Sequence, residues 1–273
     1  MTKCFMTDLN NYADVDLNYY DFEISDRESA EVLFIGLDVI DDDYLRKFVS
    51  LQLIASRTTN RDHIVSSKIP VVFLEKDDVI DVSSTAEFTM MLILMLMKRI
   101  KAASTYSRPI GLDLNRRTIT IVGYGRIGKM VSKFAAAFGM NVLVCTRYTN
   151  IDVMKQMFGS SDVVSIHLPA KKEFTHFMDK EKIGWMKDSS FIVNTARPYM
   201  IDKTAILRAL RDGRIGGVAM DYLGFETDEP DSDLLNYAKA YNNLIVTPHL
   251  GGNSRDAIRI VAERLVKKVR DMI

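Results

Sequence analysis

The chain has 273 residues, and its 36 Lys and Arg balance 36 Asp and Glu. This composition excludes collagen-like, disordered and low-complexity proteins, and zero formal charge gives no general attraction to nucleic acid or anionic lipid. Two cysteines, Cys4 and Cys145, are too few for a disulfide framework and favour a reducing, cytoplasmic setting. The N-terminus lacks the apolar core of a signal peptide, and the longest apolar run, residues 90–97, is far shorter than the roughly 20 residues of a membrane span.

Short apolar runs alternate with helical patterns along the chain, which indicates an α/β protein with parallel strands. In the first third we predict strands at 3–6, 32–35, 51–55 and 71–73, with a helical segment at 41–48. A longer helix follows, with Ser84 and Glu87 in the spacing of a capping box. This helix is apolar nearly all round through Met97, and we expect it to end near Arg108 and Pro109.

A glycine-rich loop follows the strand predicted at 118–122. A helical pattern comes next, with Gly139 at the position of a left-handed C-terminal cap, and then a strand at 141–145. In this context the first glycine permits a tight turn, the second lets backbone approach a pyrophosphate, and the third lets helix and strand pack closely. The helix N-terminus offers amides and a positive dipole end to phosphates. We therefore predict a dinucleotide site rather than a plain strand–turn–helix, formed by Gly123, Gly125, Arg126, Ile127 and Gly128.

The end of the 141–145 strand indicates which dinucleotide is bound. An acidic residue there hydrogen-bonds the adenosine ribose, whereas arginine favours a 2′-phosphate. This chain has Thr146 and Arg147 at that point, and both side chains can donate to a phosphate. The pattern favours NADP(H) and leaves NAD(H) possible. The alternative is that Arg147 is an ordinary surface residue.

Further strands are predicted at 162–167, 191–194, 217–220 and 244–247, with a C-terminal helix over 254–273. Three chemically versatile residues follow these strands: Arg197, Glu226 (five residues beyond Asp221) and His249. Singly, each could be a surface charge, part of a solvated acidic run, or a loop histidine. Together they follow strands of one nucleotide-binding sheet, at the edge where open α/β sheets bind ligands.

With these motifs the sequence resembles the D-isomer-specific 2-hydroxyacid dehydrogenases. The likeness runs from about residue 51 to the C-terminus and is densest from Ser84 to Gly252. It implies an NAD(P)-dependent oxidoreductase with a Rossmann-type doubly wound parallel sheet and a second, smaller flavodoxin-like α/β substrate domain. The dinucleotide-binding domain would span residues 83–250, and the substrate domain would combine residues 1–82 with 251–273.

The resemblance also implies roles for individual residues. Arg197 would bind the substrate carboxylate and polarise the 2-oxo group, and His249 would be the acid in reduction and the base in oxidation. Glu226 would orient the imidazole, while hydride passes between the nicotinamide and the substrate C2. Backbone amides of a substrate-domain loop, Thr58, Thr59 and Asn60, would receive the substrate carboxylate. The other implied cofactor contacts are His167, Pro169, Thr195, Ala196, Asp221 and Gly251.

Some positions depart from the family pattern. Family members usually carry the glutamate directly before a proline; here Glu229 precedes Pro230, but Glu226 has the usual distance from Asp221, so we favour Glu226. Pro198 and Asn60 stand where glycine is common. The N-terminal region is short, so its first crossover helix is expected to be trimmed or lost. These departures leave open a non-catalytic dinucleotide-binding regulatory or scaffold protein.

Partners follow from the same reasoning. Family members dimerise through the helix that runs here from Phe88 to Met97, so we expect a homodimer. The expected ligand is a small 2-oxo or 2-hydroxy acid, with neither nucleic acid nor membrane as a partner. The histidines His63, His167 and His176 show no metal-ligand spacing with either cysteine, so we predict no metal site.

Overall fold

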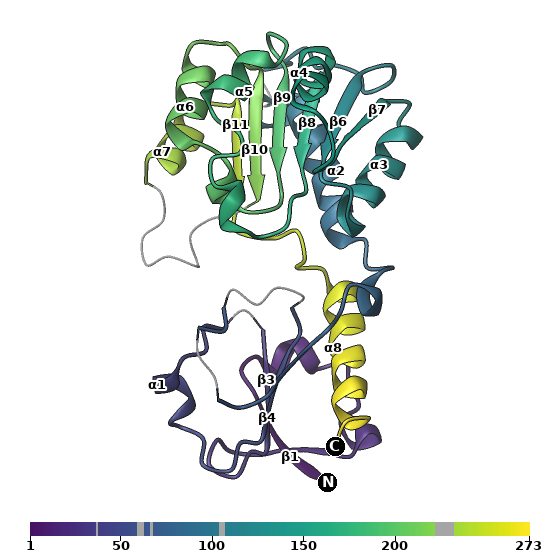
Figure 1. Cartoon of the computed structure of the whole chain (residues 1–273), viewed down its shortest axis with the longest axis vertical. Coiled ribbons are helices and arrows are strands. Elements are labelled where there is room, and N and C mark those ends of the chain that lie inside the picture. Colours follow the sequence, from purple (N-terminus) through teal and green to yellow (C-terminus); the bar gives the residue numbers. More distant parts are fainter. Residues whose placement is uncertain (37, 59–62, 66–67, 104–106, 222–231) are drawn as a thin grey trace. The chain divides into compact units, whose positions relative to one another are not determined.

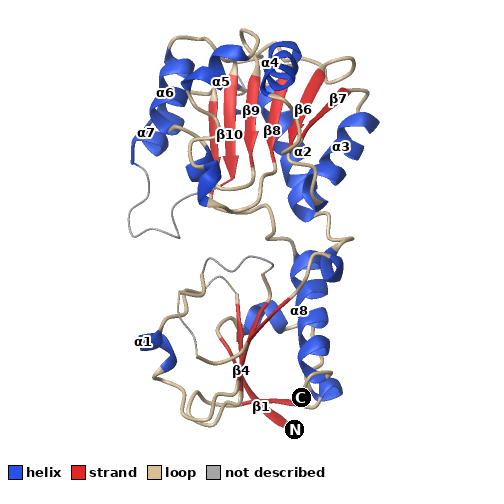
Figure 2. Cartoon of the chain, in the orientation of Figure 1, coloured by secondary structure: helices blue, strands red, loops and turns tan. Residues whose placement is uncertain are grey.

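The computed structural model describes the chain except for residues 37, 59–62, 66–67, 104–106 and 222–231. It divides into two compact units. The first combines Met1–Val82 with Ser254–Ile273, and the second is Ser83–Asn253. Each unit is built around a parallel sheet flanked by helices (Figures 1 and 2). Within the described ranges, no helix has the length and apolar character needed to cross a membrane.

The sheet of the first unit has the strand order β2-β1-β3-β4-β5, and every pair is parallel. This 2-1-3-4-5 order is that of flavodoxin-like folds. Helix α8 (Arg255–Arg270) buries Leu265 and Val269 in one core, and α1 (Asp42–Leu45) packs near the other. The strands of this sheet are β1 (Thr2–Met6), β2 (Phe22–Ile24), β3 (Val32–Ile35), β4 (Leu53–Ser56) and β5 (Val71–Phe73).

The connection between β1 and β2 is unusually short for two parallel strands. It contains two 3₁₀ turns, η1 (Leu9–Tyr12) and η2 (Asn18–Tyr20), and no α-helix. The expected trimming of the first crossover helix is therefore confirmed. Strand β2 itself was not among the predicted strands, because three residues beside a turn carry almost no periodic signal.

The sheet of the second unit is fully parallel, in the order β11-β10-β9-β8-β6-β7. Strand β6 lies between β7 and β8, so the order reverses beside it, and a crevice at such a switch point is where doubly wound sheets bind ligands. The strands of this sheet are β6 (Thr118–Val122), β7 (Asn141–Cys145), β8 (Val163–Ile166), β9 (Phe191–Asn194), β10 (Gly217–Asp221) and β11 (Leu244–Thr247).

Helices cover both faces of this sheet, because alternate strand residues point to opposite sides. Ile119 and Ile121 share a core with two helices, whereas Val122 belongs to the core on the other face, with the remaining four. The first pair is α2 (Ser84–Met97) and α3 (Arg126–Ala137); the others are α4 (Ile151–Ser160), α5 (Lys180–Trp185), α6 (Lys203–Arg211) and α7 (Ser232–Ala240).

Two expectations about α2 are wrong. Its N-cap is Ser83, whose hydroxyl bonds the Glu87 carboxylate instead of a backbone amide, so no capping box forms. The helix also ends at Met97, well before Pro109. Arg99 adopts a left-handed backbone with φ of 55°, which cannot continue a right-handed helix. At the end of α3, by contrast, Gly139 has φ of +77° and caps the helix as predicted.

Candidate active site

The glycine loop occupies the switch point directly after β6. Gly123 has φ of +94°, and a Cβ there would lie 2.5 Å from the carbonyl oxygen of His167. A Cβ on Gly128 would overlap the Gly123 carbonyl oxygen. The fold therefore requires both glycines, the first for its turn and the third for packing α3 against the loop.

Gly125 has no such structural reason to be glycine. Its φ of −79° and ψ of −165° suit any residue, and no described atom lies within 4 Å of a Cβ built there. It is the N-cap of α3, so the space above it faces the first-turn amides and the positive end of the helix dipole. An open position before a helix N-terminus fits the close approach of a pyrophosphate, so these residues suit a dinucleotide.

The turn after β7 holds itself together. The Thr146 amide donates to Thr149 Oγ1 at 2.9 Å, and the Tyr148 amide donates to Thr146 Oγ1 at 3.2 Å. Arg147 and Tyr148 extend into solvent as a pair: Arg147 Nη2 donates to the Tyr148 hydroxyl at 2.6 Å, and the guanidinium carbon lies 4.7 Å from the ring centroid. The turn thus presents a cation just beyond the strand end.

The end of β8 carries a histidine that stays neutral. His167 Nε2 lies 2.9 Å from Ser165 Oγ, and its backbone amide donates to the Val122 carbonyl at 2.7 Å. Burial lowers the pKa of His167 to about 3, because the imidazolium would lose its hydration. Pro169 follows on the surface. His167 therefore offers a neutral ring beside the glycine loop and no positive charge.

A buried asparagine fixes the loop after β9. Asn194 Nδ2 donates to the Arg197 carbonyl at 2.8 Å, and its Oδ1 accepts from the Ala196 amide at 3.0 Å. The Thr195 hydroxyl lies 2.8 Å from that of the fully buried Thr89 on α2. Arg197 itself is half-buried, with Nη1 donating to the Ala196 carbonyl at 2.9 Å. The guanidinium is therefore presented from a braced turn.

A buried carboxylate holds the segment after β11. Asp221 ends β10 and is 5% exposed; its Oδ1 accepts from Thr247 Oγ1 at 2.6 Å and from the Leu250 amide at 2.8 Å. Its Oδ2 accepts from the Gly251 amide at 2.6 Å. Between these contacts His249 is half-buried, with a left-handed backbone (φ of 55°).

The structure brings the nucleotide-unit candidates to one edge of one sheet. Arg197 follows β9 and His249 follows β11, with β10 between them, so the two strand ends lie about 10 Å apart. Thr58 belongs to the first unit, where its hydroxyl lies 3.0 Å from the Ser56 hydroxyl. Ser56 Oγ also lies 3.0 Å from His63 Nε2. The candidates Thr59, Asn60, Glu226 and Glu229 lie outside the described residues.

Several polar residues at this edge were not predicted as site residues. Asn194 and Thr247 end apolar strands, and Thr89 lies inside an apolar helix, so a single polar residue in an apolar run was the available signal. Polar groups in such surroundings need hydrogen-bond partners: Asn194 bonds the Arg197 carbonyl, Thr89 bonds Thr195, and Thr247 bonds the Asp221 carboxylate.

Comparisons with known proteins agree with this description. The family model for the NAD binding domain of D-isomer specific 2-hydroxyacid dehydrogenases matches residues 90–251. A D-specific alpha-keto acid dehydrogenase from Enterococcus faecium is 30% identical, over 82% of this chain and 77% of its own length. A glyoxylate reductase from Aeropyrum pernix is 28% identical, over 94% and 87%. The crystal structure of D-lactate dehydrogenase from Aquifex aeolicus, complexed with NAD and lactic acid, aligns with a TM-score of 0.77 at 26% identity, covering 99% of this chain and 95% of that one.

A glycine loop at the switch point of a parallel sheet, with polar residues on the following strand ends, defines a dinucleotide-binding α/β protein. The chain belongs to the D-isomer specific 2-hydroxyacid dehydrogenase family. It is thus an NAD-linked oxidoreductase of hydroxy and oxo acids, and both the predicted fold class and the stated resemblance are confirmed.

Proposed function

We propose that this chain interconverts a small 2-oxo acid and the corresponding D-2-hydroxy acid, with NADP(H) favoured over NAD(H). The observation that carries the proposal is the shared edge: Arg197 and His249 follow strands of the sheet whose switch point holds the open Gly125 position. A fixed cation and an imidazole beside a dinucleotide loop are what reduction of a 2-oxo acid requires.

Each residue then has a defined task. Arg197 forms a planar two-pronged contact with the substrate carboxylate and polarises the 2-oxo group. His249 donates a proton to the oxygen at C2 during reduction and removes it during oxidation. A nicotinamide bound beside these residues would supply the hydride to C2 in reduction and accept it in oxidation. Glu226 is assigned to orient His249 by its spacing from Asp221, and the amides of residues 58–60 are assigned to the substrate carboxylate.

The remaining assignments concern the cofactor. Gly123, Gly125 and Gly128, with the amides of Arg126 and Ile127, are proposed to hold the pyrophosphate at the N-terminus of α3. Residues beside the nicotinamide are proposed from the strand ends of β8 to β11: His167, Pro169, Thr195, Ala196, Asp221 and Gly251.

The preference for NADP(H) rests on the turn after β7. Arg147 is exposed, follows the strand end, and has no acidic neighbour in that turn to repel a phosphate. We expect Arg147→Gln to lower the NADPH-to-NADH ratio of kcat/KM by about tenfold or more, because NADPH alone loses a charged contact with its 2′-phosphate. Arg208→Gln, which removes an exposed arginine from α6, is the matched control and should leave the ratio unchanged.

The proposed assembly is a homodimer through the outer face of α2. Met91 and Phe138 are 39% and 46% exposed, although both are apolar. They belong to an apolar groove of about 570 Å³ between α2 and α3, a surface a second copy would bury. Met91→Glu should convert a dimeric mass in light scattering to a monomeric one, whereas Ile151→Glu, at an exposed apolar position on α4, should not.

The decisive experiment follows nicotinamide absorbance with NADPH and with NADH against a panel of 2-oxo acids, from glyoxylate to branched and phosphorylated members. We expect turnover with at least one acid, lowered by about 10²- to 10⁴-fold in His249→Gln. Binding of either cofactor without any turnover would contradict the enzyme and favour the regulatory or scaffold alternative. Turnover retained in His249→Gln would refute the assignment of the acid.

A further inference from the structure

His249 has a backbone conformation that its residue type does not favour. Its φ of 55° lies in the left-handed region, where a Cβ crowds the following carbonyl, so surrounding contacts must hold it there. The His249 amide donates to the Thr247 carbonyl at 3.0 Å, which closes a tight turn over Pro248. Because the backbone sets the direction of the Cα–Cβ bond, this turn decides where the imidazole is presented.

Asp221 holds the chain on both sides of that residue. On the N-terminal side, its Oδ1 accepts from the Thr247 hydroxyl at 2.6 Å. On the C-terminal side, it accepts from the amides of Leu250 at 2.8 Å and Gly251 at 2.6 Å. The carboxylate is buried at the end of β10, so its own position is fixed by the sheet. Three donors from one short segment thus converge on one rigid acceptor.

Packing on the opposite side reinforces the same conformation. A Cβ on Gly251 would lie 2.8 Å from Asp221 Oδ2 and 3.3 Å from the Thr85 methyl, so only glycine fits between the strand and α2. Ser84 Oγ donates to the Gly251 carbonyl at 2.8 Å. The segment is therefore fastened to β10 through its amides and to α2 through its carbonyl.

We propose that the hydrogen bond between the Thr247 hydroxyl and the Asp221 carboxylate is a positioning device for the acid–base residue His249. This inference rests on the proposed function and adds two residue roles to it. Thr247 touches neither substrate nor cofactor in this assignment, and Asp221 acts on His249 through the backbone in addition to any contact with the nicotinamide. Losing the hydroxyl frees the N-terminal side of the turn and lets the imidazole leave its reactive position.

The test compares Thr247→Val, which removes the hydroxyl at nearly constant shape, with Thr247→Ser, which retains it. For Thr247→Val we expect kcat to fall at least tenfold, with a larger primary isotope effect from 4-deuterated cofactor, while the Kd for the cofactor stays within about twofold. Thr247→Ser should restore kcat. Amide hydrogen exchange should quicken at Leu250 and Gly251 in the valine variant alone.

Ser84→Ala provides a second route, because it releases the same segment from α2. It should also lower kcat without changing cofactor affinity, so the proposal can still be tested if Thr247→Val does not fold. Wild-type turnover together with unchanged kcat in Thr247→Val and Ser84→Ala would overturn the positioning role alone. Absence of wild-type turnover across the panel would instead overturn the proposed function, and this inference with it.

Discussion

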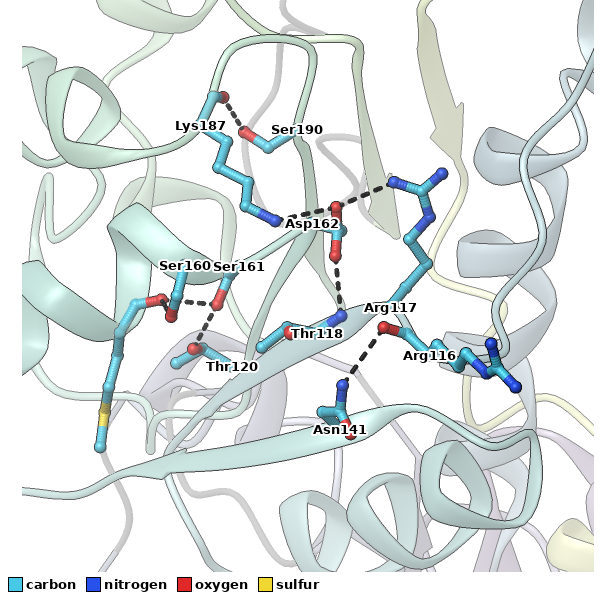
Figure 3. Close-up of polar contacts among 11 residues, drawn as sticks. Arg116, Arg117, Thr118, Thr120, Asn141, Ser160, Ser161, Asp162, Lys187 and Ser190 are labelled. Atoms are coloured by element: carbon cyan, nitrogen blue, oxygen red, sulfur yellow. Dashed lines mark hydrogen bonds and ion pairs between the residues drawn. The ribbon is translucent and has the colours of Figure 1, made fainter.

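Two carboxylates at opposite ends of the same sheet are used in different ways. Asp221, at the carboxyl end of β10, accepts hydrogen bonds from three neutral donors of the segment that carries His249. Asp162, just before the amino end of β8, accepts from the Thr118 amide at 2.7 Å and lies within 3.3 Å of two cationic groups, on Lys187 and Arg117 (Figure 3). One carboxylate orders a loop, and the other ties strand starts together.

The surroundings of Asp162 serve stability. Thr120 and Ser161 hydroxyls pair at 2.6 Å beside it, and Ser190 donates to the Lys187 carbonyl (Figure 3). Burial raises the pKa of Asp162, but the Thr118 amide and the Lys187 ammonium outweigh it and leave the pKa below its usual value. Among the residues that the structure describes, none of the predicted site residues lies at this edge. Changes at the amino edge should therefore affect folding, and changes at the carboxyl edge should affect turnover.

The largest effect should come from the carboxyl edge. His249→Gln removes the proposed acid–base group, so turnover should fall by about 10²- to 10⁴-fold. Chemical unfolding should give nearly the wild-type free energy, because the side chain is only half-buried. A large loss of stability would contradict the prediction that the carboxyl edge affects turnover and the amino edge affects folding.

Two glycines of the loop at the carboxyl edge should differ in their effects on stability and on cofactor binding. Gly128→Ala places a methyl group on the Gly123 carbonyl and should lower the free energy of unfolding by about 3 kcal/mol. Gly125→Ala meets no described atom and should lower the free energy of unfolding by no more than about 1 kcal/mol, the cost of alanine at an N-cap, while weakening cofactor binding by about tenfold. Calorimetric binding and denaturant titration measure the two effects. Equal stability losses would show that Gly125 also has a packing role.

At the amino edge, Asp162→Ala should cost about 2 kcal/mol of unfolding free energy, since an amide and two cations lose their acceptor. The kcat of the folded variant should remain within about twofold of wild type. Asp188→Ala, which removes an exposed carboxylate paired with Arg214 on the same side, is the matched control and should change stability little. A marked drop in kcat for Asp162→Ala would contradict the assignment of the amino edge to stability alone.

The smallest expected effect is a pH dependence. The folded-state pKa of Asp162 lies below its unfolded value of about 3.9, so its contribution is fully present above that pH and is lost as pH falls through the folded pKa. The stability gap between wild type and Asp162→Asn should therefore be constant near neutrality and narrow below about pH 4. Urea titrations at a series of pH values measure this, and a gap that widens on acidification would reverse the assigned sign.

Most strands and the Gly139 cap of α3 were predictable from sequence, and the two ends of α2 were not. Val71–Phe73, Thr118–Val122 and Asn141–Cys145 agree with prediction because buried parallel strands are continuous apolar runs between turns. The end of α2 was missed, since a left-handed residue such as Arg99 carries no propensity signal. The apparent capping box failed because Ser84 bonds Gly251, 167 positions away, a partner no local pattern reveals.

The candidate site divides in the same way. Spacing identified the glycine loop and the order of Arg197 and His249, since each motif is local. What braces them was not foreseen: Asn194 holds the backbone of the Arg197 turn, and Thr247 reaches across to Asp221. The first contact is local, within one turn, whereas the second joins β10 and β11, which become neighbours only after the sheet has formed.

Helix α2 belongs to two surfaces at once. Its Ser84 and Thr89 hydroxyls contact the loops after β11 and β9, respectively. Met91, on the other side of the same helix, lines the apolar groove between α2 and α3. A displacement of this one helix therefore reaches the turns of His249 and Arg197 together. Because a coupling free energy is reciprocal, self-association that moves α2 would tighten or loosen cofactor binding by the same factor by which the cofactor alters self-association.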